Sequence, residues 1–486
     1  MLSRNVQSSF LISKSMGRSM VASGKRSRQK IFFLAVLLIA IVVVGFLIPY
    51  SHKVLFALVP LVVLYFIISP KSVLWLLFLF NWVLYIPKLG KFLEFYIFSV
   101  GSVNIYLYDI FIMGLFVTVG AGFLHASARR RIMGYRVTKW VIVYLIYLML
   151  EAVRAIWGGT PYDKIVRELT GYVFCAFIIH TIMYVDKYDI EKSLKVFYYL
   201  WLLVPVFELY MLATGDTWIT DTGSVRTGHI FPNVFFLGVI AYKSIVEKLS
   251  VKNVLIILYM IAGMAMTQYR SAFVALLFLS MFIAIHYVRD MEVIKLIFYP
   301  LLLLLIGILL VTVAYMAKPD YMKGVYDRYT GTYNTGQGTI KARAYMWEIG
   351  IKTFKNNPIF GIGIGPAIGS DVDKRFGKEV NWSPHNFVVR ILAKLGLVGF
   401  ILVFTIFGSF IRHLLAWKVG DLHEKKLISF ALAYFLTTLV VHSMNTTFAA
   451  FRTAFASWLC IGMTLVYLDS LRDLRSNASN GSHSIT

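Results

Sequence analysis

Long apolar runs recur along the whole chain, separated by short polar segments that carry charges, Gly and Pro. Most of these runs approach the length that an α-helix needs to cross the hydrocarbon core of a bilayer, about 20 residues. Within lipid, such a run satisfies its backbone hydrogen bonds as a helix. The pattern predicts about 14 spanning helices, or about 12 to 13 if the short second and third runs do not span. Their bounds are 31–48, 54–69, 73–87, 105–125, 140–157, 169–185, 196–213, 230–246, 253–269, 271–288, 296–317, 389–411, 427–443 and 456–471.

The composition supports the same class. With 59% hydrophobic residues, 15% charged residues and a mean hydropathy of +0.73 over 486 residues, the chain holds more apolar sequence than a soluble core could accommodate. We therefore expect an all-α polytopic membrane protein. The net charge of +24 could suggest a nucleic-acid partner, but the basic residues are spread over many loops. A positive-inside topology explains this distribution, and no nucleic-acid partner is predicted.

The orientation follows from the basic residues of the short loops. The segment 1–30 holds seven Lys or Arg and no acidic residue, and the loop from Arg129 to Lys139 holds five more basic residues. Both are predicted to be cytoplasmic, and an even number of spans returns Arg472 and Arg475 to the same side. No small-residue cleavage site follows the first apolar run, which favours a retained first span over a signal peptide.

One long segment breaks the alternation of spans and short loops. From Lys318 to about Pro384 the chain runs for about 67 residues without a spanning segment, which is long for a passive connection. Within it, Ile340 to Phe354 has apolar residues at helical spacing, and Arg343 lies beside that face, where it could meet lipid head groups. The predicted organisation is a cytoplasmic N-terminus (1–30), transmembrane helices (31–317), a large external loop domain (318–388), further transmembrane helices (389–471) and a disordered cytoplasmic tail (472–486).

Two further patterns in the long segment are weak. The glycines of Phe360 to Pro366 alternate with apolar residues, but no Rossmann strand and helix surround them, which favours a flexible hinge over a phosphate-binding loop. Asp371 and Asp373 form a carboxylate pair of a kind more typical of a solvated loop than of a Mg²⁺ site. The sequence therefore predicts no metal site and no cofactor.

Polar residues from separate loops are predicted to converge on the external face. The ends of spans seven, nine and eleven emerge there, followed by Arg226 and His229, by Arg270, and by the loop with Arg343 and His385. Arg270 occupies a tight turn at the membrane boundary, where an ionisable residue is functional by default. Snorkelling to the head groups is the alternative for this arginine.

Arginine suits one substrate feature particularly well. Its planar fork stays charged and grips phosphate oxygens bidentately, so convergent arginines could hold a diphosphate without a metal. Arg167 at the start of the sixth span could be a further contact, and a local pair with Asp163 or Glu168 explains it equally well. Glu151, Arg154 and Glu208 lie in or near predicted spans, where an ionisable residue suggests a functional role. Mutual pairing within the bundle explains them equally well. An activated lipid is the natural donor for an external enzyme, which has no ready nucleotide supply.

The segment His385-Asn386, nine residues, Gly396-Leu397-Val398-Gly399 resembles the signature of O-antigen ligases, whose domain is shared with many O-antigen and exopolysaccharide polymerases. The Arg270-Ser271 turn and the position of Arg343 before Trp347 agree with it. So do the glycines 361–365 and the segment 226–233. The resemblance covers roughly residues 226–415. The predicted number of spans exceeds that expected of ligases, which leaves the polymerase branch open.

The resemblance implies transfer of a glycan from a polyprenyl diphosphate to a sugar hydroxyl, with inversion. His385 would be the general base, since imidazole is substantially neutral near pH 7. Structural anchoring is the alternative for His385. The diphosphate would be held by Arg270 and Arg343 and contacted by Arg226 and Arg167. The predicted supporting residues are Asn386, His229, Asn233, Gly396 and Gly399, of which His229 and Asn233 could instead cap the eighth span.

The expected partners are the polyprenyl-diphosphate-linked glycan donor, a glycan or lipid A core acceptor, membrane lipids and other polysaccharide-assembly proteins. The expected location is the bacterial inner membrane, with a periplasmic active face. A transporter that flips the same lipid-linked oligosaccharide is the alternative from another class. It should place its polar groups near the bilayer midplane and show related halves, and neither pattern is evident. Ligase and polymerase differ only in the acceptor, which the sequence does not reveal.

Overall fold

The computed structural model of the chain describes residues 68–71, 96–100, 103–214, 218–219, 225–226, 231–247, 250–267, 270–289, 339–373, 378–381, 384–444 and 451–482. The basic segment 1–30 and the predicted spans 31–48, 73–87 and 296–317 lie outside the described residues. The predicted span 54–69 also lies outside them, except at its end.

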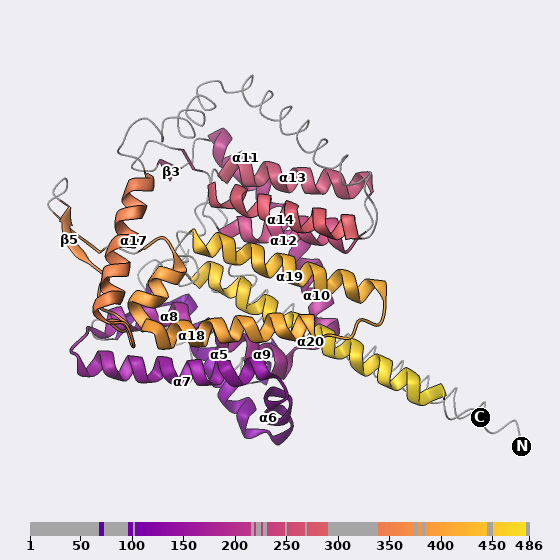
Figure 1. Ribbon diagram of the computed structural model, residues 1–486, viewed down its shortest axis with the longest axis horizontal. Coiled ribbons are helices and arrows are strands. Elements are labelled where there is room, and N and C mark those ends of the chain that lie inside the picture. The colour runs from indigo at the N-terminus through magenta and orange to yellow at the C-terminus, as the bar shows by residue number, and fades with distance from the viewer. Residues whose placement is uncertain are drawn as a thin grey trace, which may run out of the picture.

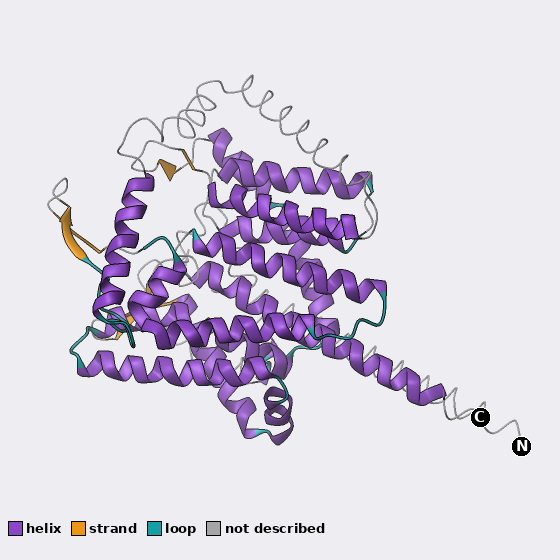
Figure 2. Cartoon of the chain, viewed as in Figure 1, coloured by secondary structure: helices purple, strands orange, loops and turns teal. Residues whose placement is uncertain are grey.

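Helices make up most of the described chain (Figures 1 and 2). The helices before the long polar segment are α5 (Leu107–Leu124), α6 (Ala126–Met133), α7 (Arg136–Trp157), α8 (Tyr162–Tyr172), the 3-10 helix η1 (Val173–Cys175), α9 (Ala176–Tyr184), α10 (Lys187–Leu202), α11 (Val204–Thr214), α12 (Phe231–Ile245), α13 (Val251–Thr267) and α14 (Arg270–Arg289). The helices within and after it are α17 (Thr339–Asn356), α18 (Phe387–Leu415), α19 (Leu422–Ser443) and α20 (Phe451–Ser482).

Three small antiparallel hairpins accompany the helices, a feature that the apolar pattern did not predict. They pair β1 (Tyr96–Val100) with β2 (Val103–Tyr106), β3 (Trp218–Ile219) with β4 (Val225–Arg226), and β5 (Ser370–Asp373) with β6 (Lys378–Asn381). The β3–β4 and β5–β6 hairpins lie between predicted spans, and β2 takes up the first two residues of the span predicted at 105–125, whose helix α5 begins at Leu107. The hairpins leave the helical character of the bundle unchanged.

The described residues include five helical stretches that are long and apolar enough to cross a membrane. They are Arg136–Trp157, Tyr162–Tyr184, Lys187–Met211, Phe387–Leu415 and Leu422–Ser443. A bent pair, Asp109–Leu124 with Ala126–Met133, forms a further candidate with a 103° bend, and α12, α13 and α14 contribute shorter apolar helices. The predicted fold class, an all-α polytopic membrane protein, is confirmed. The total number of spans stays a prediction.

Two predicted segments differ in detail from the structure. The span predicted at 196–213 falls largely within the candidate span Lys187–Met211, which is interrupted at Leu203, where α10 and α11 meet. Pro205 lies in the first turn of α11, and since proline has no backbone N–H it cannot continue the preceding helix. The disordered tail predicted at 472–486 is wrong as far as Ser482, where α20 ends. An established helix adds further residues readily, because each new residue brings a hydrogen bond.

Small residues allow the helices to approach one another closely. A Cβ atom added to Gly462 of α20 would lie 2.9 Å from Thr181 Cβ of α9. One added to Gly263 of α13 would lie 2.8 Å from Pro205 Cγ of α11. Within lipid, helices associate through such close packing, since burial against another helix removes no water.

The bundle has two distinct ends. Helices α7, α18, α19, α13 and α14 run roughly parallel across Figure 1, and α17 and β5 lie at one end, with α17 crossing the bundle direction. The last part of α20 extends beyond the opposite end. We call the end with α17, the β5–β6 hairpin and the start of α18 the loop end. The tail end holds α6, the start of α10 and the C-terminal part of α20.

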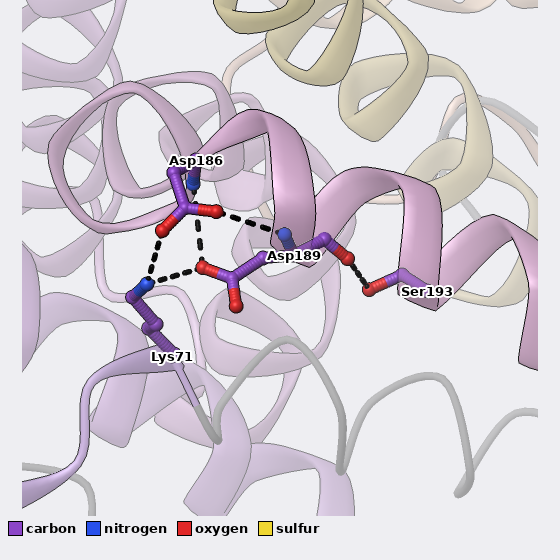
Figure 3. A network of polar contacts seen from close by, with 4 residues as sticks. All are labelled: Lys71, Asp186, Asp189 and Ser193. Carbon is purple, nitrogen blue, oxygen red and sulfur yellow. Dashed lines mark hydrogen bonds and ion pairs between the residues drawn. The ribbon is translucent and has the colours of Figure 1, made fainter. Parts of the chain in front are cut away.

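An ionic network ties two segments together at the tail end (Figure 3). Lys71 Nζ lies 2.8 Å from Asp186 Oδ2 and also contacts Asp189. Asp186 caps α10, because its carboxylate accepts a hydrogen bond from Asp189 N at 2.8 Å, and the Ser193 hydroxyl donates to the Asp189 carbonyl. The network therefore joins the short loop predicted between the second and third spans to the start of α10.

Other contacts assign further segments to the tail end. Arg475 Nη2 lies 3.1 Å from Glu424 Oε2, and the Tyr135 hydroxyl donates to Asp469. The loops around Lys71, Tyr135, Asp186 and Glu424 thus share one end with the C-terminal part of α20, as the predicted alternation of spans requires. Which end faces the cytoplasm stays a prediction.

Labelling of engineered cysteines tests the orientation. In sealed right-side-out vesicles, a membrane-impermeant maleimide should label Lys352→Cys at the loop end and spare Arg130→Cys at the tail end, because basic loops stay cytoplasmic. Both positions are exposed, and the unsubstituted chain gives the background from Cys175 and Cys460. If the reagent labelled Arg130→Cys and spared Lys352→Cys, the predicted orientation would be reversed, with the tail end outside the cell.

Candidate functional site

His385 and Asn386 form the entry into α18. Asn386 has an extended backbone, and its side-chain oxygen accepts hydrogen bonds from Val388 N at 2.9 Å and from Val389 N at 3.2 Å. Asparagine is a preferred residue at this capping position. Asn386 therefore fixes where the helix begins, and the half-buried His385 stands immediately before the first turn, at the loop end.

Helix α18 is broken at Gly396. The backbone there has φ 63° and ψ −163°, a combination that essentially only glycine adopts. Gly399 lies close to the break, and a Cβ atom added to it would lie 2.2 Å from Leu395 Cβ. The break separates residues 387–395, which we call the half-helix, from the remainder of α18. His385 thus precedes a short helix that is not a rigid continuation of the rest of α18, so contacts with other segments also determine its position.

Residues 358–363, which we call the glycine strip, lie along this break. Four backbone hydrogen bonds join them to α18: Ile362 N to Ala393 O (3.0 Å), Gly363 N to Lys394 O (2.8 Å), Leu397 N to Pro358 O (2.8 Å) and Val398 N to Ile359 O (3.1 Å). A Cβ atom on Gly361 would lie 2.4 Å from Lys394 O, and one on Gly396 would lie 2.3 Å from Ile359 O. The interpretation of this segment as a hinge is therefore wrong. Its glycines allow two backbones to pack directly against each other.

Polar side chains of α7 support the same region. The Tyr147 hydroxyl donates to the Leu395 carbonyl at 2.7 Å, just before the break. Arg154 Nη2 donates to the Gly361 carbonyl at 3.2 Å and lies 2.5 Å from Glu151 Oε2. The pairing of Glu151 with Arg154 within the bundle is confirmed, and the pair also holds the glycine strip.

Glu168 of α8 binds the half-helix and the chain beyond the glycine strip together. Its Oε2 atom lies 2.6 Å from Lys394 Nζ and accepts a hydrogen bond from Gly365 N at 2.7 Å. Its Oε1 atom lies 3.3 Å from Arg390 Nη2. The side chains of Glu168 and Lys394 are only 9% and 5% exposed, so this is a buried ionic cluster. Removing one member of such a cluster leaves the others uncompensated.

Helix α17 packs across the start of α18. A Cβ atom on Gly350 would lie 2.5 Å from Val389 Cγ1 and 3.5 Å from Pro384 Cγ, directly beside His385 in sequence. Arg343 lies two turns earlier on the same face, about 10 Å along the helix axis. Its Nη1 atom donates to the Met444 carbonyl at 3.4 Å. Helix α17 therefore reaches from the neighbours of His385 to the end of α19.

The amphipathic helix predicted at 340–354 is confirmed as α17. Its predicted apolar face points outward, because Trp347 and Ile351 are 38% and 44% exposed. The face that packs on α18 is the one with Gly350. An outward apolar face suits a helix that lies on a membrane surface.

Arg270 is the first residue of α14, directly after the short turn from α13. Before this turn, the fully buried Asn233 of α12 donates through Nδ2 to Thr267 Oγ1 at 3.0 Å, and Thr267 is the last residue of α13. Asn233 thus fixes the helix end that leads to Arg270. Helix α14 packs against α19, and the predicted alternation of spans puts the start of α14 at the same end as the end of α19, which contacts Arg343.

The remaining predicted site residues have different surroundings. Arg226 ends β4, opposite Trp218 of β3. Arg167 Cζ lies 3.8 Å from the centroid of the Tyr106 ring, a cation–π contact, and Asp109 is an electrostatic neighbour of Arg167. The sequence had suggested an acidic partner and not an aromatic one. His229 lies outside the described residues.

Sequence reasoning missed three charged residues beside the candidate site, namely Glu168 as a partner of α18, Arg390 and Lys394. The sequence could have drawn attention to Arg390 and Lys394. They lie four residues apart near the start of a predicted span, where ionisable residues are rare and often functional. Their acidic partner lies 222 and 226 residues away in sequence, and no local pattern connects them.

The arrangement combines a titratable imidazole with cationic groups from other helices at one end of the bundle. An imidazole such as that of His385 is able to accept a proton, and a guanidinium such as that of Arg343 is able to bind an anion. Such a set suits a reaction in which a hydroxyl is deprotonated while an anionic group departs. Within the described ranges, no three His, Cys, Asp or Glu side chains are grouped so that they could hold a metal ion.

Residues 255–404 match the family model described as O-antigen ligase. The match spans about a third of the 486 residues and includes Arg270, Arg343, His385 and the glycines at 396 and 399. The resemblance to O-antigen ligases is confirmed over this range. No curated protein matches the chain.

A pair of glycine substitutions on α18 tests the packing at the break. Gly396→Ala should lower the melting temperature in detergent, because the backbone strain alone costs about 1–3 kcal/mol and the new Cβ would also meet Ile359 O. Gly408→Ala is the matched control, since a Cβ there meets nothing within 4 Å and alanine favours a helix. Equal stability of both variants would contradict the close backbone contact.

Proposed function

We propose that this membrane protein, whose residues 255–404 resemble O-antigen ligases, is a glycan transferase of the bacterial inner membrane. It moves an oligo- or polysaccharide from a polyprenyl diphosphate to a sugar hydroxyl at the periplasmic face. The observation that carries this proposal is the position of His385. It stands before a half-helix held at the loop end, the same end at which α14 begins with Arg270 and α17 presents Arg343.

His385 acts as the general base in this proposal. Its imidazole accepts the proton of the acceptor hydroxyl while the hydroxyl oxygen attacks the anomeric carbon of the donor glycan. The bond between that carbon and the diphosphate oxygen breaks, and its electron pair leaves with the polyprenyl diphosphate. A single displacement inverts the anomeric centre.

The arginines bind the leaving group. Arg270 and Arg343 come from different helices, so their planar forks can grip the diphosphate from two directions and stabilise the charge that grows on it. Arg226 and Arg167 are proposed as further contacts. Asn233 supports Arg270 through the end of α13, whereas Asn386, Gly396 and Gly399 support His385 through the start and the break of α18. Guanidinium groups can neutralise the diphosphate, so the proposed reaction needs no metal.

The acceptor decides between ligase and polymerase. Purified protein supplied with donor and either a lipid A core or a second glycan chain would identify it by the product formed. Movement of donor across a vesicle membrane without a new glycosidic bond would favour a flippase and contradict transfer.

Replacement of His385 separates catalysis from binding. His385→Ala should reduce glycan transfer by about 10²–10⁴-fold, the usual contribution of a general base. Donor binding should persist, because the arginines hold the diphosphate. The measurement pairs a transfer assay in nanodiscs with a separate donor-binding assay.

The control for this variant is His423→Ala, which changes an exposed histidine at the tail end and should transfer at the parent rate. Transfer by His385→Ala at the parent rate would eliminate His385 as the base, together with the mechanism proposed above.

Conservative arginine variants test the diphosphate grip. Arg270→Lys and Arg343→Lys should each impair transfer severely, since lysine offers a point charge and not a planar fork. Arg129→Lys at the tail end is the matched control. Full transfer by both loop-end variants would refute bidentate binding. Transfer should also survive EDTA, and its loss on chelation would contradict a reaction without metal.

A further inference from the structure

The half-helix that follows His385 is separated from the rest of α18. It begins at the Asn386 cap and ends at Gly396, whose backbone conformation interrupts α18. Beyond the break, α18 packs through rings such as Phe407 and Phe410 against Phe435 of α19. These contacts fix the long part of α18. The half-helix is held at its C-terminal end by the hydrogen bonds that Ala393 and Lys394 accept from the glycine strip, and Phe387 at its start stacks on Phe404.

The ionic groups of the half-helix are its two basic residues, Arg390 and Lys394, and both bind Glu168. Glu168 also accepts a hydrogen bond from Gly365 N, two residues after the glycine strip. One carboxylate on α8 thus connects the body of the bundle with two successive turns of the half-helix. Lys394 also donates to the Pro366 carbonyl, and Arg390 has a further polar interaction with Tyr172. Glu168 supplies the negative charge that both basic residues share.

We propose that Glu168 is a positioning residue for His385, an inference that rests on the proposed function. Its carboxylate holds the half-helix in the orientation that places the imidazole against the acceptor hydroxyl. Glu168 and Lys394 do not act on the substrate themselves, because their side chains are only 9% and 5% exposed. They act by holding the half-helix, and with it His385, in position.

Loss of the carboxylate has a specific consequence. Glu168→Gln keeps the size of the side chain and removes its charge, which leaves Arg390 and Lys394 without their common counter-ion. The half-helix then shifts, and the base moves relative to the acceptor. A displacement of a catalytic group by about 1 Å can reduce the reaction rate by about 100-fold. The two principal donor-binding arginines, Arg270 and Arg343, lie on α14 and α17, and the guanidinium of Arg167 on α8 is held against the Tyr106 ring and not by Glu168. Donor affinity is therefore expected to change little.

The first test is the division between rate and binding. Glu168→Gln should reduce kcat by about 10- to 100-fold, with donor binding in nanodiscs changed by less than about threefold. Loss of binding to the same extent as kcat would overturn the positioning role, because a general loss of structure affects both. An unchanged kcat would overturn it as well.

A double-mutant cycle gives the decisive readout. If Glu168 acts through His385, then Glu168→Gln should change the residual rate of His385→Ala by less than about twofold. A full additional loss in that background would show that Glu168 acts elsewhere and would overturn this inference while His385 stays the base. A His385→Ala variant with the parent rate would instead remove the proposed function, and the inference with it.

Glu424→Gln is the matched control. Glu424 is a buried carboxylate of the same kind, since it binds Arg475 at 3.1 Å and accepts from Gly420 N at 2.7 Å, but it lies at the tail end. It should leave kcat unchanged. If Glu168→Gln fails to fold, Glu168→Asp keeps the charge on a shorter arm and should lower kcat while donor binding persists. A parent kcat in Glu168→Asp would then overturn the proposal.

Discussion

A helix that is interrupted inside a membrane protein exposes backbone N–H and C=O groups, and lipid offers them no partners. At Gly396 the glycine strip supplies these partners through four backbone hydrogen bonds, and Tyr147 supplies another to Leu395. The interruption persists because the groups it releases are satisfied within the protein. We call this contact between the glycine strip and the break in α18 the seam. It holds together the half-helix that follows His385 and the chain that follows α17.

Charge at the loop end is arranged in two layers. Glu151, Arg154, Glu168 and Lys394 bind one another or the backbone of the glycine strip and its continuation, and so hold the scaffold. Arg270 and Arg343 lie at the ends of other helices at the same face. Buried ionic clusters contribute less to stability than their contacts suggest, because the charges lose hydration. In the proposal made above, the role of this cluster is to orient the half-helix.

Much of this architecture could be predicted from the sequence, and the rest depended on distant contacts. Apolar runs locate α7, α18 and α19, and helical spacing locates α17, because each depends on residues within a few turns. The glycines of 361–365 led to a wrong prediction, a flexible hinge, because their spacing does not reveal that the backbone of α18 passes beside them. Asn386 belongs to the signature that suggested chemistry, and its side chain caps a helix. Glu168 could be placed only once the fold joined α8 to α18.

The seam also separates a part of the chain whose backbone path is fixed by hydrogen bonds from a loop whose length can vary. Residues 362 and 393 are joined by a hydrogen bond, so everything between them forms a loop that is closed at its base, with the β5–β6 hairpin at its middle. Lengthening such a loop by ten residues costs only about 0.3 kcal/mol in closure entropy. Evolution can therefore lengthen, shorten or rebuild that hairpin for a new partner while the base of the loop, and the histidine beside it, keep their places.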